Sequence, residues 1–200
     1  LAEHAVAIEG ARRLGQPVKW VEGRSENMQS MPHGRAQVQY VEMGLRSDGT
    51  ISGMRCRVVA DCGAYAGFGG ALALGPTRMM SQGVYRIPRI SFDVAAVMTN
   101  TTPVGAFRGA GRPEATALLE RMMDMAAAEL DIDPVEIRRR NFIGPDEFPH
   151  TTVAGLTYDS GDYPGNLENA LEQFGYDRWR EEQARARQEG RYLGIGLACY

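Results

Sequence analysis

The sequence predicts an α+β fold, in which helices pack against a mixed sheet that contains a hairpin. Two stretches in which apolar and polar residues alternate, 36–45 and 51–60, flank the strong turn signal Ser47-Asp48-Gly49-Thr50. A third alternating stretch lies at 89–98. Two segments with helix-start signals follow it, and this succession of strands and helices is typical of an α+β domain.

The first 35 residues predict a helix and a short strand. Apolar residues recur at helical intervals over 1–14, and Arg12-Arg13 followed by Gly15 mark the helix end. Residues 17–21 predict a strand. The alternation over 36–45 predicts a half-buried strand but leaves open which face is buried. The Gly/Ala-rich stretch 61–75 predicts irregular structure.

The helix expected over 113–130 has Pro113 as its first residue and Glu114 in its first turn, where the helix dipole favours an anion. Its apolar face is expected to contain Leu118, Met122, Met125 and Leu130.

Asp133 is the expected N-cap of the next helix, which has Pro134 at its first position, Glu136 three residues after the cap, and its end near Asn141. The run 138–140, three arginines, is interpreted as its solvated end. A polar, turn-rich stretch then precedes short helices at 167–174 and 179–188 and a strand at 193–200.

Composition argues against several classes of protein. The net charge of −3 is spread along the chain, which argues against a nucleic-acid partner, and no window approaches the roughly 18 apolar residues of a transmembrane helix. The three cysteines form no CxxC pair, which favours a reducing, cytoplasmic location over a disulfide framework or zinc site. The chain opens inside a helix and closes inside a strand, so we expect an internal stretch of a longer protein, truncated at both ends.

Residues 105–111, hereafter the glycine loop, contain three glycines and one arginine directly before the 113–130 helix. Gly109 and Gly111 permit positive φ, so the N–H groups of residues 106–111 can face an anion. The positive end of the helix and the charge of Arg108 would add to this attraction. A tight turn packed against the sheet, with Arg108 in a structural salt bridge, is the alternative.

The run Gly105-Ala106-Phe107-Arg108-Gly109-Ala110-Gly111-Arg112-Pro113-Glu114 resembles the active-site loop of the molybdenum hydroxylases, the family of xanthine dehydrogenases, aldehyde oxidases and aerobic carbon monoxide dehydrogenases. Similar segments follow one another along essentially all 200 residues: 17–22, Gly34-Arg35, 48–51, 85–88 and 133–142. Residues 107–112 most resemble large subunits labelled as a second form of carbon monoxide dehydrogenase. The resemblance implies that 1–200 is part of one aldehyde oxidase/xanthine dehydrogenase-type molybdopterin-binding domain.

The resemblance also implies a cofactor and partners. The cofactor would be molybdenum–molybdopterin cytosine dinucleotide, whose dithiolene supplies the sulfur ligands of the metal. Electrons would leave through [2Fe-2S] clusters on a small subunit and FAD on a medium subunit, in a dimer of heterotrimers. The implied reaction is hydroxylation of an aldehyde or N-heterocycle-type carbon with oxygen from water.

By resemblance, Ala106, Phe107, Arg108 and Gly109 would contact the cofactor, with the backbone of Arg108 in the vicinity of the molybdenum. Ala110 and Gly111 would line the substrate pocket. No catalytic residue is expected within this chain, since the catalytic glutamate of the family would lie beyond Tyr200.

Two positions depart from well-known members of the family. Carbon monoxide dehydrogenases place a copper-binding cysteine where this chain has Gly109, and xanthine-oxidising members place a phenylalanine where it has Ala110. The alternatives are a large subunit that oxidises carbon monoxide and a non-catalytic module that binds an anion or nucleotide.

Overall fold

The computed structural model describes residues 2–65 and 67–200, in two compact units whose boundary along the chain lies between Pro32 and His33. The first unit contains α1 (Ala2–Leu14) and α2 (Arg24–Ser30). Helix α1 confirms the predicted first helix, apart from Leu1, which lies outside the described residues.

The strand predicted at 17–21 is wrong. Within the described ranges no segment pairs with these residues, and without a partner the extended backbone forms no ladder. Helix α2 was not predicted, although the sequence holds a signal for it. Glu26 stands three residues after the N-cap Gly23, and its Oε2 accepts a hydrogen bond from the Gly23 N–H at 2.6 Å.

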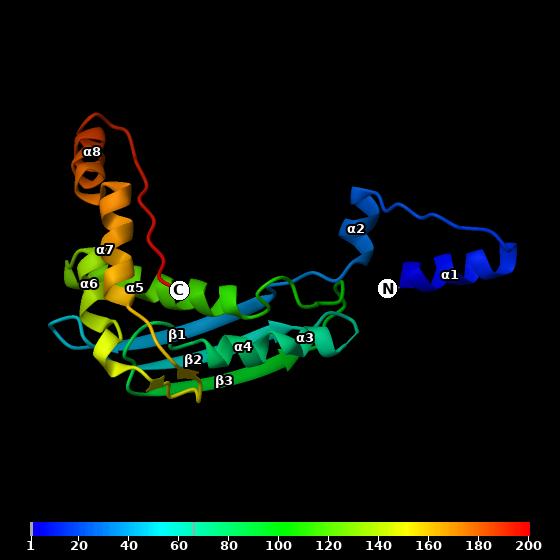
Figure 1. Cartoon of the computed structure of the whole chain (residues 1–200), viewed down its shortest axis with the longest axis horizontal. Helices are drawn as coiled ribbons and strands as arrows, with labels where there is room; N and C mark the ends of the chain where they lie inside the picture. Colours follow the sequence, from blue (N-terminus) through cyan, green and yellow to red (C-terminus); the bar gives the residue numbers. More distant parts are fainter. Residues whose placement is uncertain (1, 66) are drawn as a thin grey trace. The chain divides into compact units, whose positions relative to one another are not determined.

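The second unit is built on a three-stranded mixed sheet, as predicted (Figure 1). Strands β1 (Gln37–Leu45) and β2 (Ile51–Asp61) are antiparallel, and β3 (Ile90–Val97) pairs with β2 in parallel. The hairpin turn is also confirmed, with Gly49 at φ 85°. A parallel pair requires a crossover connection, and here it contains α3 (Phe68–Leu72) and α4 (Leu74–Met79). The expectation of irregular structure throughout 61–75 is therefore wrong.

One face of the sheet forms the core with helices α5 (Arg112–Leu130) and α6 (Pro134–Asn141). Helix α6 begins at Pro134 as predicted, and α5 begins at Arg112, one residue before the predicted start at Pro113. The Asp133 carboxylate accepts a hydrogen bond from the Val135 N–H at 2.8 Å. The predicted face of α5 is only partly right. Leu118 is buried, but Met125 is 50% exposed, and the core instead contains Leu119, Met123, Ala126 and Ala127.

The expectation that the arginines at 138–140 form a solvated helix end is wrong for Arg138, because its side chain is completely buried. Its guanidinium donates to Oε2 of Glu120 at 3.0 Å and to Oδ1 of Asp124 at 2.8 Å. Tyr85 donates its hydroxyl to the other Glu120 oxygen at 2.5 Å. Burial, the largest single effect, lowers the pKa of Arg138, but the charge of Glu120 and the hydrogen bond to Asp124 together outweigh it. The net shift is upward, so the buried arginine stays charged.

The rest of the chain adds η1 (Pro145–Glu147), a small hairpin of β4 (His150–Thr151) and β5 (Thr157–Tyr158), and helices α7 (Tyr163–Phe174) and α8 (Tyr176–Gln188). The helices lie where they were expected, with earlier starts.

The strand predicted at 193–200 is wrong, because in the described chain no neighbouring strand pairs with it. The segment is extended, and alternate residues, including Leu197 and Cys199, pack on the core. Arg138 donates to the Leu197 carbonyl at 3.2 Å. Within residues 2–65 and 67–200, none of the helices has the length and apolar character needed to cross a bilayer.

Candidate functional site

The glycine loop lies where two segments from neighbouring strands come together. Because β2 and β3 are parallel, the chain leaves both strands at the same edge of the sheet. The two following segments then approach closely: a Cβ on Gly69 would lie 3.1 Å from the Cα of Gly105. The segment before β1 joins them, since the His33 N–H donates to the Pro103 carbonyl and the Gly105 N–H donates to the His33 carbonyl.

Asp61, the last residue of β2, holds the segments that follow β2 and β3 in place through its side chain. Its Oδ1 accepts hydrogen bonds from the Gly63 N–H and the Thr99 hydroxyl, both at 2.7 Å, and its Oδ2 accepts from the Thr101 hydroxyl at 3.0 Å. The bond from Thr99, followed by those from Gly63 and Thr101, lowers the pKa of Asp61. Its carboxylate therefore holds the segments that follow β2 and β3 together.

We expect low pH to remove the stability that the Asp61 carboxylate contributes to the fold. A carboxyl group whose pKa is lower in the folded than in the unfolded state stabilises the fold fully above its unfolded pKa of about 4, and the stabilisation disappears as the pH falls through the folded value. Thermal unfolding from pH 6 down to pH 2.5 should show a steeper loss of Tm for the wild type than for Asp61→Asn. Parallel curves would contradict this assignment.

The glycine loop consists of two successive turns. The Ala110 N–H donates to the Phe107 carbonyl at 2.7 Å, and the Arg112 N–H donates to the Gly109 carbonyl at 3.1 Å. The φ angles are 89° at Gly109, 35° at Ala110 and 98° at Gly111. Among non-glycine residues with positive φ, Ala110 stands out for lacking a polar side chain, so the loop holds it at a cost of about 1–3 kcal/mol.

The structure shows why positions 109 and 111 require glycine. A Cβ on Gly111 would lie 2.1 Å from the Ala73 carbonyl oxygen and 2.7 Å from the Thr77 nitrogen. A Cβ on Gly109 would lie 2.7 Å from Cδ of Pro113. At Gly111 the loop therefore lies directly against the backbone at the start of α4.

The positive end of α5 is occupied by the protein's own carboxylate. Glu114 is 7% exposed, and its Oε2 accepts a hydrogen bond from the Gly111 N–H at 2.9 Å. The N-cap position thus has an anion already, and the expectation that this helix end adds its charge directly to ligand binding is wrong.

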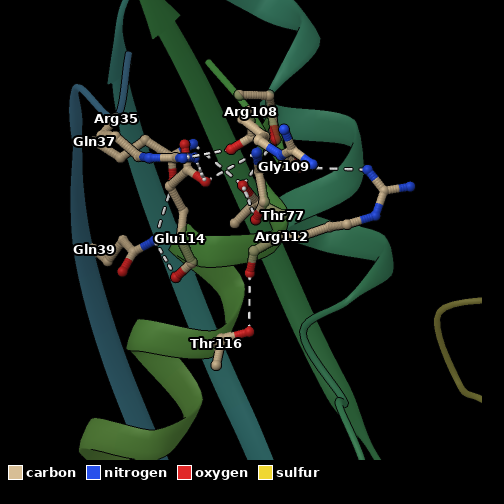
Figure 2. Close-up of polar contacts among 11 residues, drawn as sticks. Arg35, Gln37, Gln39, Thr77, Arg108, Gly109, Arg112, Glu114 and Thr116 are labelled. Atoms are coloured by element: carbon tan, nitrogen blue, oxygen red, sulfur yellow. Dashed lines mark hydrogen bonds and ion pairs between the residues drawn. The ribbon is translucent and has the colours of Figure 1, made fainter. Parts of the chain in front are cut away.

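Arg35 links α5 to the glycine loop, and Figure 2 shows its contacts with Glu114 and Arg108. Its Nη1 lies 2.9 Å from Oε2 of Glu114, and its Nη2 donates to the Arg108 carbonyl at 2.5 Å. Its guanidinium also lies 5.2 Å from the ring centroid of Phe107. The structural salt bridge that the sequence reasoning assigned to Arg108 as an alternative is therefore made by Arg35.

Three polar side chains support the start of α5 (Figure 2). Gln39 of β1 donates to the Glu114 carbonyl at 3.3 Å, and Gln37 donates to the Thr77 hydroxyl at 3.2 Å. Thr77 is completely buried and in turn reaches the Gly111 carbonyl at 3.2 Å. These residues, like Arg35, were missed as site residues, since each lies far along the chain from its partner; the only signal was that Gly34-Arg35 belongs to the resembling segments.

The glycine loop contains hydrogen-bond donors without acceptors. In the described part of the chain, nothing accepts a hydrogen bond from the backbone N–H groups of residues 106–109, and no carboxylate pairs with Arg108. Ala106, Phe107 and Arg108 are exposed, Phe107 to 65%. Four N–H groups beside one guanidinium form a donor set that suits an anionic, oxygen-rich ligand.

The same surface offers no metal ligands of its own. No group of three or more His, Cys, Asp or Glu side chains that could hold a metal ion exists among the residues that the structure describes. The donor set described above fits an anionic cofactor that carries the ligands of its own metal.

Comparisons with known proteins agree with this arrangement. Residues 1–142 match the family model for the molybdopterin cofactor-binding domain. The chain is 38% identical, over 98% of its length, to 6-hydroxypseudooxynicotine dehydrogenase complex subunit gamma of Paenarthrobacter nicotinovorans, and 39% identical, also over 98%, to the carbon monoxide dehydrogenase large chain of Hydrogenophaga pseudoflava. The crystal structure of quinoline 2-oxidoreductase from Pseudomonas putida 86 matches 98% of the chain with a TM-score of 0.90 and 33% identity. The chain spans about a quarter of the length of each of these three proteins, 25% in every case.

Proposed function

The chain belongs to the family of molybdopterin cofactor-binding domains, and on that premise we propose that its glycine loop holds the molybdenum end of the cofactor in the large subunit of a molybdenum hydroxylase. The observation that carries the proposal is the set of four unpartnered N–H groups at 106–109 beside the guanidinium of Arg108.

In this proposal the protein supplies position and charge. The N–H groups of Ala106, Phe107, Arg108 and Gly109 donate to anionic oxygens of the cofactor, and the Arg108 side chain neutralises part of its charge. The exposed ring of Phe107 shields one side from water. Ala110, with the backbone of Gly111 behind it, borders the substrate. The cofactor itself, when bound, supplies a redox-active metal together with its sulfur ligands.

We propose that the cofactor is the cytosine dinucleotide form and that the substrate is an aldehyde or a nitrogen heterocycle. One relative is named for quinoline and another for 6-hydroxypseudooxynicotine, which supports this class. Oxidation of carbon monoxide is the second candidate function, because another relative is named for that activity. Gly109 argues against oxidation of carbon monoxide, since this position offers no thiol to hold copper. Molybdenum without copper in the purified protein would support the first candidate, and both metals would support the second.

Residues 1–200 would form one stretch of a larger molybdopterin-binding domain. The large subunit would act with an iron–sulfur subunit and an FAD subunit, in a dimer of heterotrimers, and a relative named as one subunit of a complex supports such partners. Three free cysteines, two of them buried, support a reducing cytoplasmic location.

The Arg108→Ala variant tests the proposal. Because nothing in the described chain pairs with this guanidinium, the Tm of the full-length protein should stay near the wild-type value. Loss of a hydrogen bond to a charged group, worth about 1.5–3 kcal/mol, should lower turnover or cofactor affinity about ten- to hundredfold. Molybdenum content and steady-state kinetics measure both quantities.

Arg121→Ala, at an exposed position on the middle of α5, is the matched control and should change neither quantity. Full turnover of Arg108→Ala at full molybdenum content would refute the role of Arg108. A wild-type protein that purifies without molybdenum after expression with a complete cofactor pathway would refute the proposed function itself.

A further inference from the structure

We propose that Arg35 is a positioning residue that locks the peptide between Arg108 and Gly109, so that the Gly109 N–H faces the cofactor. The inference rests on the proposed function, because the cofactor is what the N–H would meet. It assigns a task to a residue 73 positions away from Arg108 in the sequence.

The argument begins with the geometry of a peptide group. In a trans peptide, the carbonyl oxygen and the N–H lie in one plane and point in opposite directions. Arg35 holds the Arg108 carbonyl oxygen with Nη2 at 2.5 Å, on the side of β1 and Glu114 (Figure 2). The Gly109 N–H of the same peptide therefore points away from Arg35. It is one of the four donors that find no acceptor in the described chain.

This peptide has two possible orientations. It is the central peptide of the four-residue turn 107–110, in which φ is positive at Gly109 but not at Arg108, the signs of a type II turn. A type I turn differs mainly by a rotation of this peptide by about 180°. The hydrogen bond from Ala110 to Phe107 closes both turns, and glycine tolerates both signs of φ. The turn alone therefore does not choose between them.

Arg35 selects one of the two peptide orientations, because its own position is determined by other contacts. Its Nη1 pairs with Glu114, which is buried and caps α5, and its guanidinium stacks on Phe107. Its backbone is in the left-handed region at φ 71°, next to Gly34, where a Cβ would lie 2.6 Å from Cβ of Phe107. A fixed cation at the carbonyl also polarises the peptide, which makes the Gly109 N–H a stronger donor.

The experiment separates positioning from simple neutralisation of Glu114. In the full-length protein, Arg35→Met leaves a buried carboxylate unpaired and should lower both the Tm and cofactor retention. The double variant Arg35→Met/Glu114→Gln removes that charge while the amide oxygen can still accept from Gly111, so its Tm should recover. Its molybdenum release should remain at least about tenfold faster than that of the wild type, as expected for loss of one charge-assisted hydrogen bond.

Arg35→Lys gives an independent comparison. A lysine ammonium can pair with Glu114 but lacks the planar fork that reaches the Arg108 carbonyl at the same time. This variant should keep a near-wild-type Tm and still release molybdenum faster. Arg55→Met is the control, since Arg55 pairs with Glu42 at a solvent-exposed site, and it should change neither quantity.

The outcomes distinguish the two claims. Fast release from both Arg35→Lys and the double variant, at near-wild-type Tm, supports positioning. Wild-type release from the double variant would overturn the inference and leave the proposed function standing, since the wild type would still hold molybdenum. A wild type without molybdenum would overturn both.

Discussion

The Arg138→Met variant is expected to lower the free energy of unfolding by about 3–5 kcal/mol, the usual effect of removing one partner from a buried ion pair. Arg138 is completely buried, and it is the cation that compensates Glu120, whose side chain is only 7% exposed. Methionine keeps an unbranched apolar chain in place of the aliphatic part of arginine. The loss would therefore come mainly from the removed guanidinium, which leaves the carboxylate uncompensated and the Leu197 carbonyl without its donor.

The neighbouring residue provides the control. Arg139 pairs with Glu168 at an exposed site, so Arg139→Met should cost no more than about 1 kcal/mol. Adding Glu120→Gln to Arg138→Met removes the buried charge and should recover part of the loss, since the amide oxygen can still accept from Tyr85. Urea denaturation of the four proteins measures the differences. Equal effects at positions 138 and 139 would show that the pair is not buried in solution.

Gly111→Ala is the second substitution with a large expected effect. A Cβ there would lie 2.1 Å from the carbonyl oxygen of Ala73, which belongs to a rigid backbone segment. The φ of 98° adds left-handed strain. Overpacking of about 1–3 kcal/mol and a backbone penalty of similar size predict a combined loss of about 2–6 kcal/mol. The loop would have to move away from α4, so molybdenum content should fall as well.

Gly155 separates the two contributions. Its φ of 92° nearly equals that of Gly111, but a Cβ there would have no neighbour within 4 Å. Gly155→Ala should therefore show the backbone penalty alone, about 1–3 kcal/mol, with unchanged molybdenum content. If the two variants lost equal stability, the contact between the loop and α4 would be contradicted.

The elements that the sequence predicted well are those with local causes. The turn at Gly49, the alternation over β2 and the capping of α6 by Asp133 each depend on residues a few positions apart. The strand predicted at 17–21 failed because strand formation requires a partner elsewhere in the chain.

Arg138 was misread for a related reason. Ile137, Arg138 and Asn141 share the buried face of α6, which the helical period could have revealed. Its partner Glu120, however, belongs to another helix, and no local pattern connects the two residues. The candidate site shows the same contrast between local and distant features. The glycine loop was visible in the sequence, but Arg35 was not identified as the residue that organises it.

The parallel pairing of β2 with β3 also has a consequence for the order of folding. Asp61 and Val97 are register partners, so the edge that supports the glycine loop exists only after a closure across 36 residues. Arg35 and Glu114, which complete the site, are 79 residues apart. Contacts of such long sequence separation form slowly, because the entropy of loop closure is lost before they contribute stability. We therefore expect the donors of the glycine loop to be assembled late in folding and, on the proposed function, the cofactor to bind after the sheet has formed.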